Sequence, residues 1–312
     1  MKRKFYSGEI MHIYQRTVSG FNIFYCAEDF LVFYTIVSVY AHKYDIVLLG
    51  LCQMIDHIHL LGSSRNLESM SKFISAYTSR FVKEFNRRTG RTGHLFEKEY
   101  GSAIKRETKK VRSAIAYLFN NPVEKMLCDR AEEYRWNYLE YYGEVSLKPF
   151  RQCSWKLQKS IKIIQERFSS GQYLKYNLIE MIFKGLDKIE TEDLTAWIIK
   201  LYFPFDVKKV TGYYKSYADM LTAINSNTGS EHDIMEHSYC KTDVPYREIM
   251  VILKKEGITD ISSDIHLTHT CFNCFHNLII RNTGATVQYQ RGMTCCFINI
   301  TYSLDIQLGR LL

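Results

Sequence analysis

The first half of the chain alternates between segments with a two-residue hydrophobic repeat and segments with a helical repeat. Strands are predicted over Glu9–Val18, Ile46–Met54, His57–Gly62 and Leu95–Ile104. Helices are predicted over Ala27–Tyr44 and Thr108–Asn120, and between them over a segment with Leu67, Met70, Phe73, Ile74, Tyr77, Phe81 and Phe85 at helical spacing. The order β-α-β-β-α-β is typical of an α+β fold, a ferredoxin-like (split βαβ) antiparallel sheet with helices on one face. We expect the His57–Gly62 strand near the centre of that sheet.

The second half of the chain has a different pattern, which is mostly helical. Helices are predicted over Trp155–Phe168, Asn177–Leu186, Thr191–Leu201 and Ser216–Ile224, followed by a polar linker at 225–233. The pattern changes around Gly143–Pro149. This change predicts two domains, residues 1–148 and a mostly α-helical C-terminal domain, residues 149–312.

Composition indicates a folded globular protein with a basic N-terminal half. Hydrophobic residues make up 46% of the 312 residues, and only four are proline. Residues 1–150 hold 22 Lys/Arg and 16 Asp/Glu, a large share of the net charge of +8. Within 80–112 there are 11 basic and 4 acidic side chains, an excess typical of a polyanion site or of a solvated helix face.

The start of the chain and the cysteines suggest a location in the cell. The first residues are basic and are followed by no apolar signal-peptide core, and the nine cysteines do not form a small disulfide framework. The longest apolar stretch, about Phe30 to Ala41, is too short to cross a bilayer. We therefore expect a cytoplasmic protein that does not enter the membrane.

Two histidines in one predicted strand are the first candidate for chemistry. His57 and His59 are separated by one residue, so in a strand both imidazoles point to the same face. Two converging imidazoles are half of a metal site. The pattern alone also fits structural zinc sites, cupin-type barrels and chance.

A tyrosine and an asparagine follow in the last helix of the first half. Tyr117 and Asn121 are four residues apart, which places them on the same side of a helix. Pro122 disfavours helical dihedrals at Asn121, so Asn121 is expected at the end of the helix. With 23 tyrosines in the chain, most must be packing residues, and only the context of Tyr117 singles it out.

Three motifs in this order resemble those of the single-tyrosine HUH transposases, and most closely the REP-associated tyrosine transposases. They are His57-Ile-His59, Gly90-Arg-Thr-Gly-His-Leu-Phe96 and Tyr117-x-x-x-Asn121-Pro-Val123. Residues 134–143 are also similar to the Trp-Ser-Ser-Tyr segment of that family, with Asn137 in place of a serine. The resemblance extends over roughly residues 8 to 143.

The resemblance implies a mechanism and a set of site residues. His57, His59 and Asn121 would bind a divalent metal, Mg²⁺ or Mn²⁺, and the two imidazoles suit Mn²⁺ better. Tyr117 would attack a DNA phosphate to give a 5′-phosphotyrosine and a free 3′-hydroxyl. A phenol with a pKa near 10 is a poor nucleophile at pH 7 and needs such activation. The family acts on single-stranded DNA, often beside small hairpins, as a monomer or a homodimer.

Basic and polar residues near these motifs are candidates for DNA binding, through phosphate contacts and, with nearby aromatic residues, base stacking. Arg87, Arg88 and Arg91 suggest either a phosphate-binding loop or a solvated turn. The other candidates in this half are His94, Lys105, Arg106, Lys109 and Lys110.

The C-terminal region allows two interpretations. Residues 274–292 resemble a helix-turn-helix, in which a second helix, Ala285–Arg291, would present Thr286, Gln288 and Arg291 to a DNA groove. Alternatively, Cys271, Cys274 and His276 could bind zinc, although their spacing fits no common finger. The stretch Cys295–Ile306 is strand-like and fits neither interpretation.

Three functional hypotheses remain open from the sequence. The first is a metal-dependent transposase that cleaves and transfers single-stranded DNA through Tyr117. The second is a transposase-derived, non-catalytic DNA-binding regulator, which needs only the basic surface and the helix-turn-helix. The third is a zinc enzyme built on His57 and His59, which would tolerate the loss of Tyr117.

Overall fold

The computed structural model describes residues 7–18, 22–97, 99–143 and 150–226, and the backbone of two short strands near the C-terminus. The chain divides into two compact units. The described residues from 7 to 226 lie in the first unit, and the two short strands lie in the second.

The first unit is built on a four-stranded antiparallel sheet. Its strands are β1 (Ile10–Arg16), β2 (Val47–Gln53), β3 (His57–Ser63) and β4 (Gly101–Lys105), in the spatial order β2-β3-β1-β4. Helix α1 (Ala27–Lys43) connects β1 to β2, and helix α2 (Leu67–Thr89) connects β3 to β4. This is the predicted split βαβ order, and β3 lies inside the sheet as expected.

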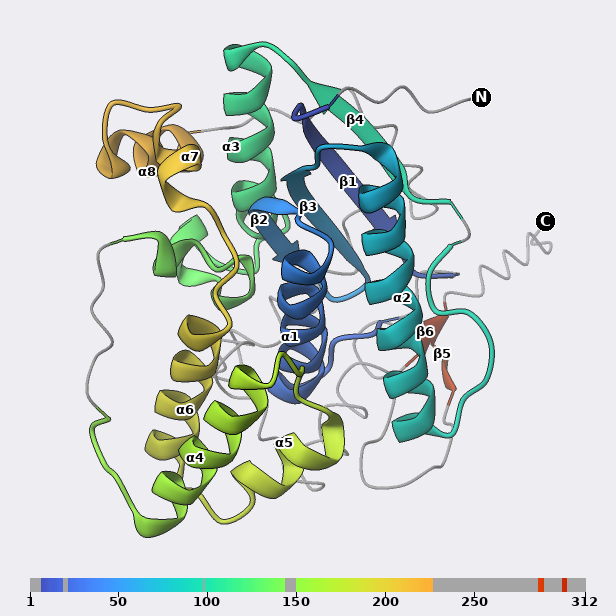
Figure 1. Ribbon diagram of the computed structural model, residues 1–312, viewed down its shortest axis with the longest axis vertical. Helices are drawn as coiled ribbons and strands as arrows, with labels where there is room; N and C mark the ends of the chain where they lie inside the picture. Colours follow the sequence, from blue (N-terminus) through green and yellow to red (C-terminus); the bar gives the residue numbers. More distant parts are fainter. Residues whose placement is uncertain are drawn as a thin grey trace, which may run out of the picture. The chain divides into compact units, whose positions relative to one another are not determined.

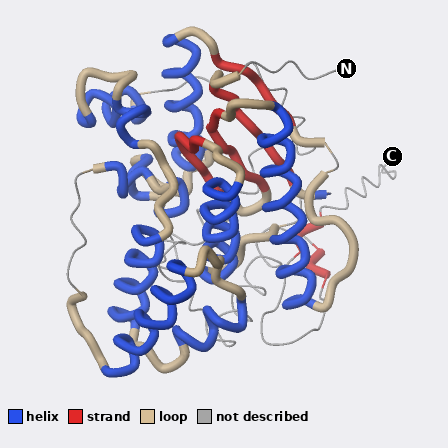
Figure 2. The backbone as a smooth tube through the Cα atoms, viewed as in Figure 1, coloured by secondary structure: helices blue, strands red, loops and turns tan. Residues whose placement is uncertain are grey.

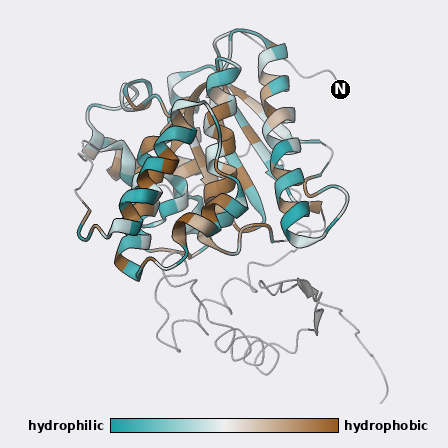
Figure 3. Cartoon of the chain, turned by 60° about the horizontal axis from the view of Figure 1, so that its bottom comes forward, coloured by the Kyte–Doolittle hydropathy of each residue, from teal (hydrophilic) through white to brown (hydrophobic). Residues whose placement is uncertain are grey.

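Helices α1 and α2 cover one face of the sheet (Figures 1 and 2). Gln15 of β1 accepts a hydrogen bond from Tyr77 Oη of α2 at 2.5 Å, and Gln53 Nε2 of β2 donates to the Phe30 carbonyl of α1 at 3.3 Å. Figure 3 shows the strands in mixed hydrophobic and hydrophilic colours and the outer helices with hydrophobic and hydrophilic sides. The predicted arrangement, with the helices on one face, is confirmed for these two helices.

Helix α3 (Thr108–Glu124) lies on the opposite face, which the sequence did not predict. A Cβ atom added to Gly50 of β2 would lie 3.2 Å from side-chain atoms of both Leu118 and Phe119. The helix has its own buried apolar stripe, including Val111, Ile115 and Leu118, and this stripe needs a second apolar surface. Gly50 lets the backbone of the strand approach the helix closely.

Three short 3₁₀ turns after α3 attach it to the edge strand β2: η2 (Ala131–Glu133), η3 (Arg135–Asn137) and η4 (Leu139–Tyr142). Tyr134 Oη donates to the Gln53 carbonyl at 2.8 Å, and Tyr142 Oη donates to the Leu49 carbonyl at 2.7 Å. Asn137 Nδ2 donates to the Phe119 carbonyl of α3 at 3.2 Å. The segment that follows the tyrosine helix therefore holds that helix against the sheet.

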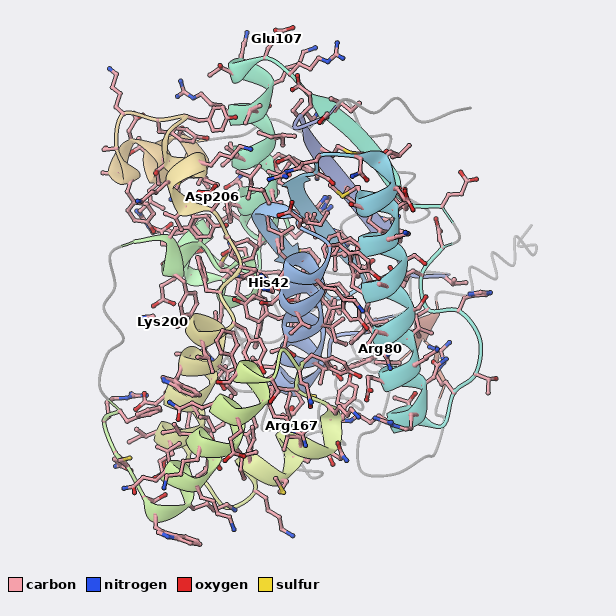
Figure 4. The ribbon with its side chains drawn as sticks, viewed as in Figure 1. His42, Arg80, Glu107, Arg167, Lys200 and Asp206 are labelled. Atoms are coloured by element: carbon pink, nitrogen blue, oxygen red, sulfur yellow. The ribbon has the colours of Figure 1, made fainter. Side chains whose placement is uncertain are left out.

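Five helices follow: α4 (Trp155–Ser169), α5 (Tyr176–Phe183), α6 (Lys188–Leu201), α7 (Val207–Thr211) and α8 (Tyr217–Asn225). The four predicted helices are confirmed, and the short α7 was not predicted. Tyr34 Oη of α1 donates to the Ile199 carbonyl of α6 at 2.8 Å. The backbone N–H of Asp206, which is labelled in Figure 4, donates to the Leu48 carbonyl of β2 at 2.8 Å. Helices α4 to α8 therefore belong to the same compact unit as the four-stranded sheet.

Other features of the sequence prediction need correction or stay open. The strand predicted over Leu95–Ile104 is shorter, because β4 begins at Gly101 and Phe96 forms only an isolated bridge with Thr17. The predicted domain boundary between 148 and 149 falls at 144–149, outside the described residues, and stays a prediction.

The second unit contains two short antiparallel strands, β5 (Thr286–Gln288) and β6 (Asn299–Thr301). The helix predicted over Ala285–Arg291 is therefore wrong at 286–288, where β-branched threonine and valine favour a strand. A strand within 295–306 is confirmed by β6. The remainder of the predicted helix-turn-helix, and the cysteines and histidine of the zinc alternative, lie outside the described residues.

None of the helices in the described part of the chain has the length and apolar character needed to cross a membrane.

Candidate active site

Strand β3 places His57 and His59 on the face of the sheet that α3 covers. The two rings lie edge to face with centroids 5.1 Å apart, and their exposed fractions are 4% and 0%. Tyr14 of β1 lies directly opposite His59, and Arg16 lies opposite His57. Because side chains alternate along a strand, the β1 residues His12, Tyr14 and Arg16 share this face with the two histidines.

Each of the two histidines has a polar partner for its Nδ1 atom. His57 Nδ1 lies 2.6 Å from Asp56 Oδ1, and a carboxylate can only accept, so His57 Nδ1 carries the proton in this pair. His59 Nδ1 lies 3.1 Å from Nε2 of His12, which is completely buried. In the neutral ring of His57 the Nε2 atom is therefore a lone-pair donor.

Helix α3 brings Tyr117 and Asn121 to the same place. The Tyr117 ring lies edge-on to His59 with centroids 5.3 Å apart, and Asn121 Nδ2 lies 3.3 Å from His59 Nε2. Pro122 does not end the helix at Asn120 as predicted, because α3 continues to Glu124. A proline in the last turn removes only one backbone N–H donor, and thus one helical hydrogen bond. The Pro122 carbonyl still accepts a hydrogen bond from the Leu127 N–H at 2.9 Å.

The side chains at this position fit a divalent metal ion. His57 Nε2 and Asn121 Oδ1 are both buried, and neither has a hydrogen-bond partner. Buried polar atoms are nearly always satisfied, so two unpaired acceptors beside His59 Nε2 suit a cation. Among the described residues, no group of three or more His, Cys, Asp or Glu side chains is arranged to hold a metal. The candidate set is therefore two imidazoles and one amide oxygen.

The electrostatics of the site keep His59 neutral. Burial lowers the pKa of His59 well below its usual value, and the nearby positive groups of His57, His12, Arg16 and Lys125 lower it further. A neutral imidazole is the form that binds a metal. Arg16 and Lys125 also bring positive charge close to the site, with the Arg16 guanidinium carbon 5.8 Å from the centroid of the Tyr14 ring.

The sequence did not single out His12, Tyr14, Arg16, Asp56 or Lys125. Asp56 directly precedes the His57-Ile-His59 motif and offered a local signal, since a carboxylate beside a metal-binding histidine often orients it. The β1 residues offered none. Their place in the site depends on the register between β1 and β3, two strands separated by a whole helix and a third strand.

The predicted basic cluster at the end of α2 is largely engaged within the protein. Arg87 pairs with the buried Glu84. The Arg88 guanidinium lies 4.5 Å from the centroid of the Tyr176 ring and 3.5 Å from Glu180, so it holds α5 against α2. His94 is exposed and Arg91 is half-buried. Of the four predicted DNA-binding residues Arg87, Arg88, Arg91 and His94, Arg88 is the least well placed to contact DNA.

The second predicted basic cluster surrounds the start of α3. Lys105 is only 1% exposed, so the prediction that its side chain meets DNA does not fit its position on β4. Arg106, Lys109 and Lys110 are exposed, and Lys110 Nζ lies 3.8 Å from Glu107, which directly precedes α3 and is labelled in Figure 4. Thr286 and Gln288 lie in β5, and Arg291 lies outside the described residues.

Comparisons with known proteins found a matching family and a similar solved structure. Residues 12–121 match the family described as "Transposase IS200 like", a segment that contains His57, His59, Tyr117 and Asn121. A solved structure described as "Structure of the REP associates tyrosine transposase bound to a REP hairpin" is similar to 49% of this chain and 90% of that chain, with 11% sequence identity and a TM-score of 0.38. No curated protein matches the chain significantly.

The four-stranded split βαβ sheet, the histidine pair and the tyrosine helix are the features that the sequence resemblance to the single-tyrosine transposases implies. Residues 12–121 are thus similar to the IS200-like transposase family, in agreement with the resemblance found in the sequence.

Proposed function

We propose that this chain is an active transposase that cleaves single-stranded DNA and transfers the strand through a phosphotyrosine at Tyr117. The observation that carries the proposal is the position of Tyr117, whose ring lies 5.3 Å from that of His59 and 5.7 Å from that of His12. A packing tyrosine has no need of a cluster of imidazoles. A nucleophilic tyrosine needs groups that accept its proton and balance the charge of the phosphate.

The residues that would hold a divalent cation are His57 through Nε2, His59 through Nε2 and Asn121 through Oδ1. This assignment uses the two buried acceptors that have no hydrogen-bond partner. A set of two imidazoles and one amide oxygen suits Mn²⁺ better than Mg²⁺. When bound, the cation would withdraw charge from the DNA phosphate and favour ionisation of a nearby phenol.

The proposed reaction exchanges one phosphodiester for another. The Tyr117 oxygen forms a bond to phosphorus, and the bond from phosphorus to the 3′-oxygen of the preceding nucleotide breaks. The phenolic proton is lost, and the departing 3′-oxygen gains one and becomes a hydroxyl. The product is a 5′-phosphotyrosine, which keeps the phosphodiester energy, so a new 3′-hydroxyl can displace Tyr117 without ATP. Arg16 and Lys125 supply positive charge where the phosphate would lie.

The proposed substrate is a single DNA strand beside a hairpin. Exposed Arg106, Lys109 and Lys110 form a basic surface at the start of the tyrosine helix, which suits phosphate contacts. Every proposed catalytic group comes from one chain, so a monomer suffices for chemistry. The proposed location is the cytoplasm, as the sequence predicts.

The site is closed in this structure, and the proposed reaction requires it to open. Tyr117 is 5% exposed and Asn121 is 1% exposed, so a DNA phosphate reaches them only after neighbouring side chains move. The same burial favours the second candidate function, a DNA-binding regulator without turnover. In that protein Tyr117 would be a packing residue, and the basic surface alone would bind DNA.

A covalent-adduct assay distinguishes these two functions. The full-length protein is mixed with hairpin-bearing single-stranded oligonucleotides and Mn²⁺ or Mg²⁺, then separated on a denaturing gel. A metal-dependent adduct that is absent from Tyr117→Phe and His57→Ala supports the transposase. The control is Tyr214→Phe, which removes a hydroxyl that donates to the Arg112 carbonyl at 3.3 Å and should keep the adduct. Salt-sensitive binding with no adduct would support the regulator.

A further inference from the structure

His12 is a buried histidine that neither the motif nor the proposed ligand set uses. It lies on β1 and is 0% exposed, and its Nε2 atom is 3.1 Å from Nδ1 of His59. The two rings are tilted by 37° with centroids 5.2 Å apart. A buried pair of imidazoles in hydrogen-bond contact must share one proton between the facing nitrogens, so each ring fixes the tautomer of the other.

We propose that His12 is a positioning residue, which accepts the Nδ1–H of His59 and thereby leaves His59 Nε2 without a proton, in the form that can bind the metal. This inference rests on the proposed function. It extends that function by one residue, which acts on the metal only through His59.

The hydrogen bonds around His59 agree on this tautomer. Asn121 Nδ2 lies 3.3 Å from His59 Nε2, and an amide NH₂ group can only donate, so Nε2 must be the acceptor. The proton of the neutral His59 ring is then on Nδ1, facing His12 Nε2. In the same arrangement Asn121 Oδ1 has no hydrogen-bond partner. A metal bound to His59 Nε2 would replace the Asn121 N–H at that nitrogen and could then bind Oδ1. The opposite tautomer would place a proton on the His59 nitrogen that the metal needs.

The two ligand histidines then have matching arrangements. His57 Nδ1 faces Asp56 Oδ1 at 2.6 Å, and His59 Nδ1 faces His12 Nε2 at 3.1 Å. In both cases an acceptor faces the Nδ1 proton, which leaves Nε2 of the same ring without one. Such outer partners orient metal-binding histidines and raise their basicity.

The geometry separates this role from that of a direct ligand. His12 meets the Nδ1 side of the His59 ring, whereas Asn121 meets the Nε2 side. A single ion bound to His59 Nε2 and Asn121 is therefore on the far side of the ring from His12. The His12 ring is also 5.7 Å from that of Tyr117, so a direct role as the base for Tyr117 is the competing explanation.

Nitrogen NMR of the full-length protein with labelled histidine rings tests the inference without DNA or metal. Near pH 7.5, the wild-type protein should show His59 with its proton on Nδ1. In His12→Phe, which keeps an aromatic ring but has no acceptor, His59 should lose this single tautomer. In His12→Gln, whose side-chain carbonyl can accept, the Nδ1–H form should persist. Wild-type His59 in the Nε2–H form would overturn the inference even if the variants failed to fold.

Calorimetric titration of the same proteins with Mn²⁺ adds a second readout. We expect affinity to fall by about 10–100-fold in His12→Phe and to recover in His12→Gln, as for other outer partners of metal-binding histidines. Unchanged tautomer and affinity in His12→Phe, with loss of the adduct at saturating Mn²⁺, would overturn the inference in favour of a base for Tyr117. A wild-type protein that does not bind Mn²⁺ would instead overturn the proposed metal chemistry, and the inference with it.

Discussion

Asn121 Nδ2 of α3 lies 3.3 Å from His59 Nε2 of β3, a contact between residues 62 positions apart in the chain. The contact fixes the last turns of α3 over the histidine strand, and Tyr117, one turn earlier, lies beside the His59 ring. Helix α3 therefore places both Tyr117 and the proposed ligand Asn121 beside the histidines of β3.

Replacement of Asn121 by alanine should weaken Mn²⁺ binding. The loss of affinity should be larger than in a control variant that lowers the stability of the fold to a similar extent. The variant loses one proposed ligand and one buried contact, and the lost contact costs about 1–3 kcal/mol of stability. Asn137→Ala is the matched control, because Asn137 also makes buried amide contacts, to the Phe119 and Ala131 carbonyls. Titration with Mn²⁺ should show weaker binding only in Asn121→Ala. Equal Mn²⁺ affinity in the two variants would exclude Asn121 as a ligand.

Asp56→Ala should lower the Mn²⁺ affinity without removing a proposed ligand. Asp56 Oδ1 lies 2.6 Å from His57 Nδ1, so its loss frees the His57 ring to rotate and to change tautomer. Partners of this kind change metal affinity by about 10–100-fold. Asp129→Ala removes an exposed carboxylate on the loop after α3 and should leave the affinity unchanged. A similar affinity for Asp56→Ala and wild type would show that His57 does not depend on this partner.

Much of the fold was predictable because local sequence determines it. The apolar repeat from Leu67 to Phe85 predicted α2, which is capped by Asn66, whose side chain accepts from the Ser69 N–H at 2.8 Å. The alternation in β3 also predicted that His57 and His59 share a face. The position of α3 on the opposite face from α1 and α2 was not predictable in this way, since any apolar helix stripe fits either face.

The parts of the site that were missed depend on contacts between distant segments. His12 is one histidine in an apolar strand, and only the register of β1 against β3 places it beside His59. Lys105 and Arg88 were predicted to meet DNA because they belong to basic stretches. In the fold Lys105 is buried and Arg88 lies against Tyr176, because charge along the sequence does not report which side of an element faces solvent.

Tyr117 and His57 should act within one chain. Both residues belong to the same folded unit, and α3 is held to its own sheet through Asn137 and Asn121. A mixture of Tyr117→Phe and His57→Ala proteins should therefore form no adduct with DNA. The positive control is a mixture of wild type with either variant. An adduct recovered by mixing the two variants would show that the tyrosine helix is exchanged between subunits.

Asp29 should make the stability of the sheet unit depend on pH. Its carboxylate accepts from the Tyr25 and Cys26 N–H groups at 2.9 and 3.2 Å, and burial raises its pKa while the Arg88 charge opposes that rise. A carboxyl whose folded pKa is raised stabilises the protein fully below its unfolded pKa, and this contribution is lost as pH rises through the folded value. Asp29→Asn lacks this dependence.

The stability of wild type relative to Asp29→Asn should therefore fall as pH rises from about 4 towards 8. Urea unfolding of both proteins across this range measures the difference. A difference that stays constant or grows with pH would contradict the raised pKa.

The most direct test of the central claim is to locate the DNA on the protein. The covalent adduct is digested with nuclease and trypsin and analysed by mass spectrometry. Residues 113–125 form one tryptic peptide in which Tyr117 is the only tyrosine. We predict a nucleotide on this peptide, attached through a 5′-phosphate to Tyr117, in samples that contained Mn²⁺. Attachment to another tyrosine, or metal-independent attachment, would contradict the proposed function.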